Sequence, residues 1–180
     1  MDSLRGQLLI SSGGLFDPNF RHTVVLIGEH NHDGALGVIL NRDLDVTVSD
    51  AVPMLETLVP AGDALYEGGP VQPASPVLVA EFTDPDFADL SIFEKVGFLV
   101  GDLPDGIAQH VLRARVYAGY SGWGAGQLES EMAAGSWIVD PARVEDVFTT
   151  QPELLWSRVL QRKGPEYRHL SRMPFDPSMN

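Results

Sequence analysis

Residues 117–132 read YAGYSGWGAGQLESEM, and the pattern changes abruptly inside this stretch. Apolar and polar residues alternate over about 111–119, which is typical of a strand. Four glycines follow, and the run QLESEMAA after them favours a short helix closed by Gly135. We therefore predict a strand–loop–helix junction whose glycines permit special backbone geometry around Trp123.

This stretch departs from two sequence patterns, one catalytic and one cofactor-binding. A nucleophile elbow needs G-x-S-x-G, but GYSGW at 119–123 has Trp in place of the final Gly. A dinucleotide loop needs G-x-G-x-x-G, and the glycines at 122, 124 and 126 have a different spacing. Glu129 and Glu131 would also oppose a phosphate at the helix N-terminus. Neither chemistry is predicted.

Short strands with few helices surround this junction and predict an α+β fold. The predicted sheet is mixed or antiparallel and flanked by helices, because hairpin-like neighbours dominate the first half of the chain. Strands are predicted at 6–11, 22–28, 35–40, 64–70, 75–83, 97–100, 111–119 and 136–140. Helices are predicted at 47–58, 127–135, from Pro141 and over 152–163, with a short helical stretch near 89–95.

The composition indicates one domain with a substantial core. The chain has 180 residues, of which 44% are hydrophobic. No apolar run approaches the roughly 18–20 residues of a membrane helix, and the N-terminus does not resemble a signal peptide. The absence of cysteine excludes disulfides, thiolate catalysis and cysteine-ligated zinc. We expect a single domain over residues 1–180, located in the cytoplasm, with a loosely ordered tail after about 165.

The net charge of −13 is distributed unevenly. Residues 1–150 contain 7 Lys/Arg and 22 Asp/Glu, whereas residues 151–180 contain 5 and 3. Such a surface repels nucleic acid, which binds through Lys and Arg at its phosphates. The basic residues near the C-terminus are interpreted as a solvated helix face and tail. We expect a protein or small-molecule partner, no membrane association and no direct nucleic-acid binding; the oligomeric state is left open.

Metal and acid–base sites have no specific signal. EHNHD at 29–33 contains two histidines, but a zinc site needs three or four converging ligands. We interpret this segment as a solvated hairpin turn, and His22 and His110 as structural. Carboxylates are too numerous for proximity in sequence to indicate a shared site. No metal and no cofactor is predicted.

Several segments together resemble the AlgH/YqgE family of small bacterial proteins, whose biochemical function is not established. Each is weak alone, but the set keeps its order over nearly the whole chain. The resemblance implies an α+β fold with a partly barrel-like sheet surrounded by helices, and no agreed activity, cofactor or catalytic residues. The family name is associated with gene regulation, and the acidic charge favours an indirect role. The matching segments are GQLLIS (6–11), DPNFRHTVVLIGEHNHDGALGVILNR (17–42), YEGGPV (66–71), RVYAGYSGWGAGQLESEM (115–132), GSWIVD (135–140) and LW (155–156).

Polar residues in these segments that packing does not explain form the candidate site. They are Asp17, Asn19, Arg21, Asn41, Arg42, Trp123 and Gln127. If the first hairpin pairs in register, 17–21 and 41–42 lie at the same end of it. Turn formation, carboxylate pairing and core packing are the competing structural interpretations.

Two functions remain open. The leading hypothesis is a binding or regulatory module, since no coherent catalytic constellation is present. The alternative is a small hydrolase-type enzyme with a polar site near Asn19, Arg21 and Asn41. Catalytic residues are not predicted.

Overall fold

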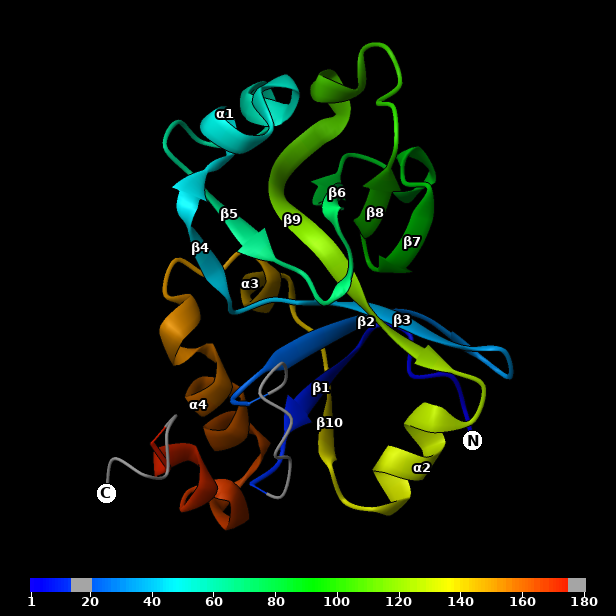
Figure 1. The fold of residues 1–180 in the computed structure, drawn as a ribbon, viewed down its shortest axis with the longest axis vertical. Coiled ribbons are helices and arrows are strands. Elements are labelled where there is room, and N and C mark those ends of the chain that lie inside the picture. Colours follow the sequence, from blue (N-terminus) through cyan, green and yellow to red (C-terminus); the bar gives the residue numbers. More distant parts are fainter. Residues whose placement is uncertain (14–20, 175–180) are drawn as a thin grey trace.

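The computed structural model describes residues 1–13 and 21–174 (Figure 1). Its strands are β1 (Gln7–Ser11), β2 (Val24–Asn31), β3 (Gly34–Ile39), β4 (Asp43–Thr47), β5 (Ala64–Glu67), β6 (Val71–Phe82), β7 (Leu90–Phe93), β8 (Val96–Val100), β9 (Val111–Gly124) and β10 (Trp137–Pro141). Its α-helices are α1 (Val48–Ala51), α2 (Gln127–Ala133), α3 (Val144–Val147) and α4 (Pro152–Lys163). Short 3-10 helices lie at Pro53–Leu58, Pro85–Phe87, Ile107–His110, Pro165–Tyr167 and Leu170–Arg172.

The strands form one open sheet in the order β10-β1-β2-β3-β9-β6-β8-β7, with β5 pairing β9 and β4 pairing β5. All pairs are antiparallel except the parallel pair of β5 and β9. The α+β prediction is confirmed for a single domain, and the sheet formed by the described residues does not close into a barrel. It does fold over itself, because the Phe98 ring of β8 lies directly over Gly28 of β2.

Strand β9 is the centre of the sheet (Figure 1). Its first part pairs β6 from Val111 to Tyr120, and its last part pairs β3 from Ser121 to Gly124. The predicted glycine loop at 119–127 is therefore mostly strand, and only Ala125 and Gly126 separate β9 from α2. The prediction was wrong because Gly122 and Gly124 weaken a strand signal without preventing the extended backbone.

Other predicted elements also differ from the structure. The helix at 47–58 is split into α1 and a 3-10 helix, because Pro53 lacks the N–H that a continuous helix requires. The helical stretch near 89–95 is strand β7, whose pairing with β8 overrides a weak local preference. The helix from Pro141 is displaced: β10 runs through Pro141, and α3 begins at Val144.

The glycines of EGGP and GYSG allow two chain segments to cross in contact. A Cβ on Gly68 would lie 2.2 Å from the Gly119 carbonyl oxygen, and one on Gly69 would lie 2.3 Å from the Tyr120 carbonyl oxygen. Gly119 itself has φ of 71°, which favours glycine. The Ser121 hydroxyl is buried and donates to the Gly68 carbonyl oxygen at 3.1 Å. These contacts hold β9 against the residues that lead into β6.

Three hydrophobic clusters fill the domain. The first lies between the sheet and α4, and includes Leu155, Trp156 and Leu160. The second packs β6, β8 and β9 against α1 and the 3-10 helix after it. The third lies under α2 and includes Trp123 and Trp137, whose rings meet edge to face with centroids 6.2 Å apart. Tyr167 and Leu170 of the C-terminal segment pack against the first cluster.

His30 contradicts the interpretation of EHNHD as a solvated turn. Residues 29–31 belong to β2, the turn itself is His32–Asp33, and His30 is buried. The His30 Nδ1 accepts from the Leu4 N–H at 3.0 Å, so its Nε2 carries the proton and donates to Glu129 Oε1 at 2.6 Å. His30 therefore ties the N-terminal segment and α2 to the hairpin.

The contact between His30 and Glu129 predicts acid sensitivity. The hydrogen bond from His30 lowers the Glu129 pKa below its ordinary value of 4.5. A carboxyl whose pKa is lowered by folding stabilises the protein above its unfolded pKa, and this contribution disappears as pH falls through the folded pKa. We expect Glu129→Gln to be less stable than the native chain at pH 7, with the difference shrinking below about pH 4. Urea unfolding midpoints at both pH values measure this; an unchanged difference would contradict it.

Candidate functional site

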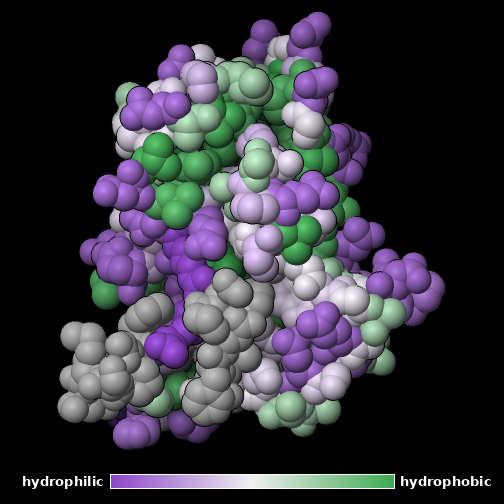
Figure 2. Space-filling model, in the orientation of Figure 1, coloured by the Kyte–Doolittle hydropathy of each residue, from purple (hydrophilic) through white to green (hydrophobic). Residues whose placement is uncertain are grey.

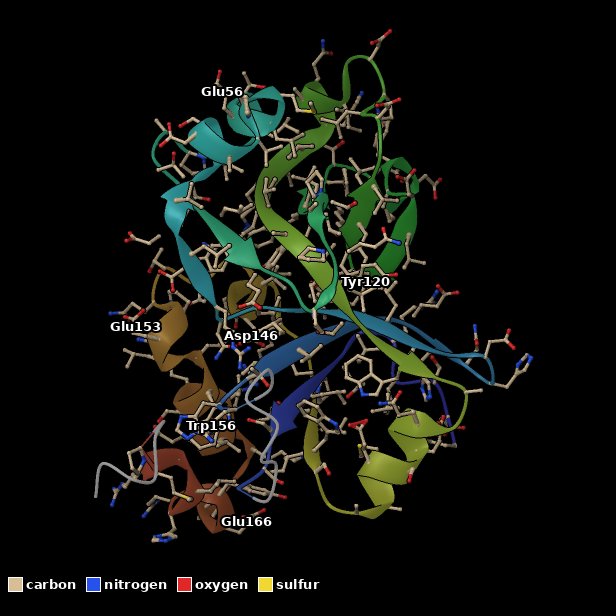
Figure 3. All side chains as sticks on the ribbon, viewed as in Figure 1. Glu56, Tyr120, Asp146, Glu153, Trp156 and Glu166 are labelled. Carbon is tan, nitrogen blue, oxygen red and sulfur yellow. The ribbon has the colours of Figure 1, made fainter. Side chains whose placement is uncertain are left out.

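A hollow of about 420 Å³ lies where the start of β2, the end of β3 and α4 meet. Its lining is more polar than the surrounding core and carries both signs of charge. The lining residues are Arg21, His22, Asn41, Arg42, Glu153, Trp156, Ser157, Ser171 and Met173. Glu153 and Trp156 come from the same helix, α4 (Figure 3). We call this the β2–α4 hollow.

Trp156 and His22 form its aromatic wall. Their rings stack with centroids 3.8 Å apart and planes 9° from parallel. The indole Nε1 donates to the Ser11 carbonyl oxygen at 3.0 Å, which fixes the ring between β1 and α4. His22 has φ of 50°, a left-handed backbone conformation that is uncommon for a residue with a side chain. Strained backbone of this kind persists where the surroundings enforce it, often at binding sites.

The surroundings of His22 disfavour the charged form of its imidazole. Burial lowers the pKa of its imidazole, and the charge of neighbouring Arg21 lowers it further. A neutral imidazole has one donor and one acceptor nitrogen, so His22 in this form contributes polar atoms to the wall without adding charge.

Asn41 and Arg42 hold the entry to β2 in place. The Asn41 side chain accepts from the Val24 N–H at 3.0 Å and donates to the His22 carbonyl oxygen at 2.8 Å. One Arg42 guanidinium nitrogen donates to the Arg21 carbonyl oxygen at 3.3 Å. The side-chain oxygen and nitrogen of Asn41 are thus both hydrogen-bonded to backbone groups. This supports a structural role for Asn41.

The serines of the hollow show no catalytic arrangement. Ser157 Oγ accepts from Gln161 Nε2 at 3.1 Å, and Ser171 Oγ donates to the Arg168 carbonyl oxygen at 2.7 Å. A serine nucleophile would instead be hydrogen-bonded to a base such as histidine.

Two guanidinium groups, one carboxylate and a neutral imidazole make this a site suited to binding a small anion with a polar body.

The structure brings three of the seven predicted site residues together. Arg21, Asn41 and Arg42 line the β2–α4 hollow, as the hairpin register predicted. Asp17 and Asn19 lie outside the described residues. Trp123 and Gln127 lie elsewhere: Trp123 packs in the third hydrophobic cluster, and Gln127 Oε1 accepts from the Gly124 N–H at 3.0 Å.

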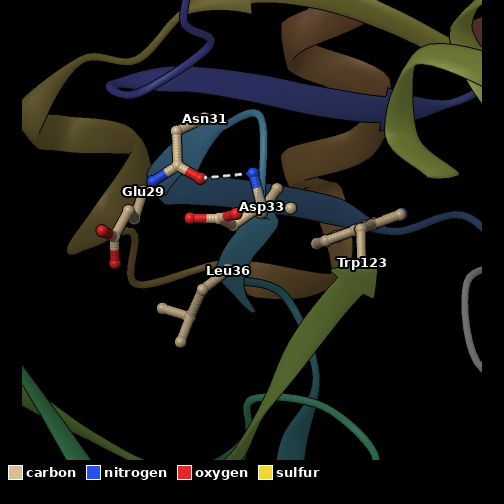
Figure 4. Close-up of a pocket in the computed structure, with 7 residues that line it drawn as sticks. Glu29, Asn31, Asp33, Leu36 and Trp123 are labelled. Carbon is tan, nitrogen blue, oxygen red and sulfur yellow. Dashed lines mark hydrogen bonds between the residues drawn. The ribbon is translucent and has the colours of Figure 1, made fainter. Parts of the chain in front are cut away.

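Trp123 borders a second, shallower hollow of about 280 Å³ at the tip of the β2–β3 hairpin (Figure 4). Glu29 and Asp33 line it together with Leu36, and the Asn31 side chain accepts from the Asp33 N–H at 2.8 Å. Within residues 1–13 and 21–174, no group of three His, Asp or Glu side chains is placed to hold a metal ion. None of the helices in those ranges is long and apolar enough to cross a membrane.

Sequence reasoning missed His22 and Trp156 as members of the site. His22 was interpreted as structural, and Trp156 was included only as part of the predicted helix over 152–163. Trp156 is 4% exposed, and only the fold shows that its ring also backs a hollow. The one signal in the sequence was that His22 directly follows Arg21, which was already a candidate site residue.

The strands and helices define a single α+β domain. Comparison with known proteins identifies its family. Residues 8–168 match the AlgH-like (DUF179) family. A UPF0301 protein of Streptomyces avermitilis is 38% identical, with 100% of this chain and 97% of that protein covered. A UPF0301 protein of Chlorobium limicola is 39% identical, with 99% and 97% covered.

Two solved structures share the fold. The crystal structure of protein DIP2367 from Corynebacterium diphtheriae has a TM-score of 0.84 at 29% identity, covering 95% of this chain and 93% of that chain. The solution structure of AlgH from Pseudomonas aeruginosa has a TM-score of 0.70 at 28% identity, covering 95% and 94%. The chain belongs to the AlgH-like family, and the resemblance inferred from its motifs is confirmed. None of these names states an activity.

Proposed function

We propose that this protein is a binding module that takes a small anionic molecule in the β2–α4 hollow and reports its presence to a partner. The observation that carries the proposal is the convergence of Arg21, Arg42 and the His22–Trp156 stack on one hollow. Trp156 comes from α4, more than 110 residues after the β2–β3 hairpin that positions the other three residues. In this proposal the module acts in the cytoplasm, a compartment compatible with a chain that has no cysteine.

The lining chemistry narrows the ligand class. A guanidinium has five N–H donors in a planar fork, so it can bind a carboxylate or phosphate while keeping a protein partner. Glu153 opposes a ligand of high negative charge but can accept from a ligand hydroxyl or amine. A hollow of about 420 Å³ suits a metabolite rather than a macromolecule. We therefore propose a small carboxylate or phosphate ester with at least one hydroxyl or amino group.

A thermal-shift series tests this binding. A ligand that binds only the folded protein stabilises it by about 2.7 kcal/mol at one hundred times its Kd. For a domain of this size, that corresponds to a rise in Tm of roughly 5–10 °C. The probes are inorganic phosphate, pyrophosphate, 3-phosphoglycerate, citrate and a nucleoside monophosphate, and Trp156 fluorescence gives a second readout because its ring forms the wall.

Matched variants separate the hollow from general charge effects. Arg42→Gln should abolish the Tm rise, and Glu153→Gln should keep or increase it for the more highly charged probes. Arg113→Gln removes the same charge from an exposed position outside the hollow and should leave the rise unchanged. A shift that survives Arg42→Gln, or no shift with any probe, contradicts the proposal.

A further inference from the structure

Two apolar hollows on the opposite half of the molecule form one continuous groove. They measure about 660 and 190 Å³ and share Met54, Pro76, Gly101 and Asp102. The groove lies between the 3-10 helix at Pro53–Leu58 and the ends of β6 and β8. We call it the β6–β8 groove. It is separate from the β2–α4 hollow, with which it shares no lining residue.

The groove exists because β6 bulges away from β9. Val71 pairs Tyr120 and Pro76 pairs Ala118, so four residues of β6 stand opposite the single residue Gly119. Residues 72–76 are consequently exposed and form one wall. Gln72 at the start of the bulge has φ of 47°.

The groove leaves large hydrophobic side chains in solvent. Met54 is 80% exposed and Val100 is 53% exposed, and they stand on opposite walls. Figure 2 shows hydrophobic side chains gathered in the upper half of the molecule, with hydrophilic side chains on either side. Exposed apolar surface that is contiguous and rimmed by polar groups marks a site of association.

Nearly all of the net charge belongs to the segment that builds this groove. Residues 43–110 contain 13 Asp/Glu and one Lys, a balance of −12 against −13 for the whole chain. The residues outside 43–110 carry 12 Asp/Glu and 11 Lys/Arg. Asp102 lines the groove. Asp50 of α1 and Glu56 of the 3-10 helix do not line it but are exposed on the neighbouring helical segments (Glu56 is labelled in Figure 3). The groove is therefore mostly apolar inside, and the segment that builds most of it is strongly acidic.

This combination restricts the occupant. Two copies docked groove to groove would bring two segments of charge −12 together, and nucleic acid would be repelled for the same reason. A strand added to β6 is disfavoured, because Pro73 and Pro76 remove two N–H donors from the free stretch of that strand. An amphipathic helix needs only side-chain contacts, and basic residues on its polar side would match the rim.

We propose that the β6–β8 groove docks a basic amphipathic helix of a partner protein. The apolar face of the helix enters between Met54 and Val100, and its Lys and Arg residues face Glu56 and Asp102. The inference is independent of the ligand proposed for the β2–α4 hollow.

A designed peptide tests the groove directly. The probe is a labelled helical peptide of about 14 residues, four turns long, with Leu on one face and Lys on the other. Fluorescence anisotropy with the full chain should show binding that weakens as salt rises. A peptide with Glu in place of Lys should not bind. Amide chemical shifts of the labelled protein should change at Met54, Val100 and Asp102.

Substitutions at exposed positions locate the peptide-binding site without destabilising the fold. Met54→Ser with Val100→Ser should weaken the Leu/Lys peptide at least tenfold, whereas Leu112→Ser, at a position 59% exposed outside the groove, should not. Glu56→Lys with Asp102→Lys should weaken it at least tenfold at low salt. Glu145→Lys with Glu166→Lys makes the same charge change outside residues 43–110 and should have a smaller effect.

Three results would overturn the proposal. They are equal binding of the acidic peptide, unchanged affinity after the Met54 and Val100 substitutions, and shift changes confined to the other half of the molecule. Sedimentation of the native chain supplies a fourth test: self-association abolished by Met54→Ser with Val100→Ser would assign the groove to a second copy instead.

Discussion

Gly68→Ala is expected to destabilise the fold severely. The new Cβ would lie 2.2 Å from the Gly119 carbonyl oxygen and 3.1 Å from the Tyr117 Cβ. Neither chain can move aside cheaply, because Gly68 N–H donates to Ala118 and the Gly68 carbonyl oxygen accepts from Ile39, both at 2.9 Å. We expect the free energy of unfolding to fall by about 4 kcal/mol or more, a large part of the roughly 5–15 kcal/mol of a typical domain. Urea unfolding followed by tryptophan fluorescence measures it.

Gly122→Ala is the matched control for this substitution. It lies in the same motif, has an ordinary backbone conformation, and its new Cβ would meet Val71 at 3.6 Å, a normal contact. We expect a change within about 0.5 kcal/mol. If Gly68→Ala and Gly122→Ala are equally stable, the close contact between the EGGP and GYSG segments does not require glycine at position 68.

The same motif shows what sequence reasoning can and cannot supply. The alternating pattern identified the first part of β9, up to about Gly119. The pattern did not show that Gly68 and Gly119 face one another, because that contact joins residues 51 positions apart. Glycine has no side chain whose chemistry reveals its partner. Only the register of β9 with β5 and β6 reveals why those positions need glycine.

The candidate site was predictable in part for a related reason. Arg21 and Arg42 were placed together by the hairpin that joins β2 to β3, which is a local feature of the sequence. Trp156 reaches the same hollow from α4, more than 110 residues later, through the packing of the first hydrophobic cluster. Helical periodicity assigns such a residue to the core and contains no information about which strand end the helix covers.

Arg162→Ala is expected to lower the free energy of unfolding by about 3 kcal/mol and Tm by roughly 6–12 °C. Arg162 binds Asp146 through two hydrogen bonds, of 2.9 and 3.0 Å, and also donates to Asp140 at 3.1 Å. Asp146 is only 4% exposed, so removing the guanidinium leaves a buried carboxylate without its counter-charge. The same contacts hold α4 to α3 and β10. Thermal and urea unfolding at pH 7 measure the loss.

Two further variants show whether the stranded charge or the lost packing causes this cost. In Arg162→Met with Asp146→Asn, no charge is left uncompensated, and the Asn side chain still accepts from the Arg143 N–H as Asp146 does at 2.9 Å. Because replacing a buried ion pair by uncharged groups is often nearly neutral, we expect this double variant to recover at least half of the lost stability. Arg158→Ala removes an exposed arginine of the same helix and should change stability by less than about 0.5 kcal/mol. A double variant as unstable as Arg162→Ala would mean that the arginine acts by packing α4 against β10. In that case the hydrogen bond from the Arg143 N–H is sufficient to stabilise the buried charge of Asp146.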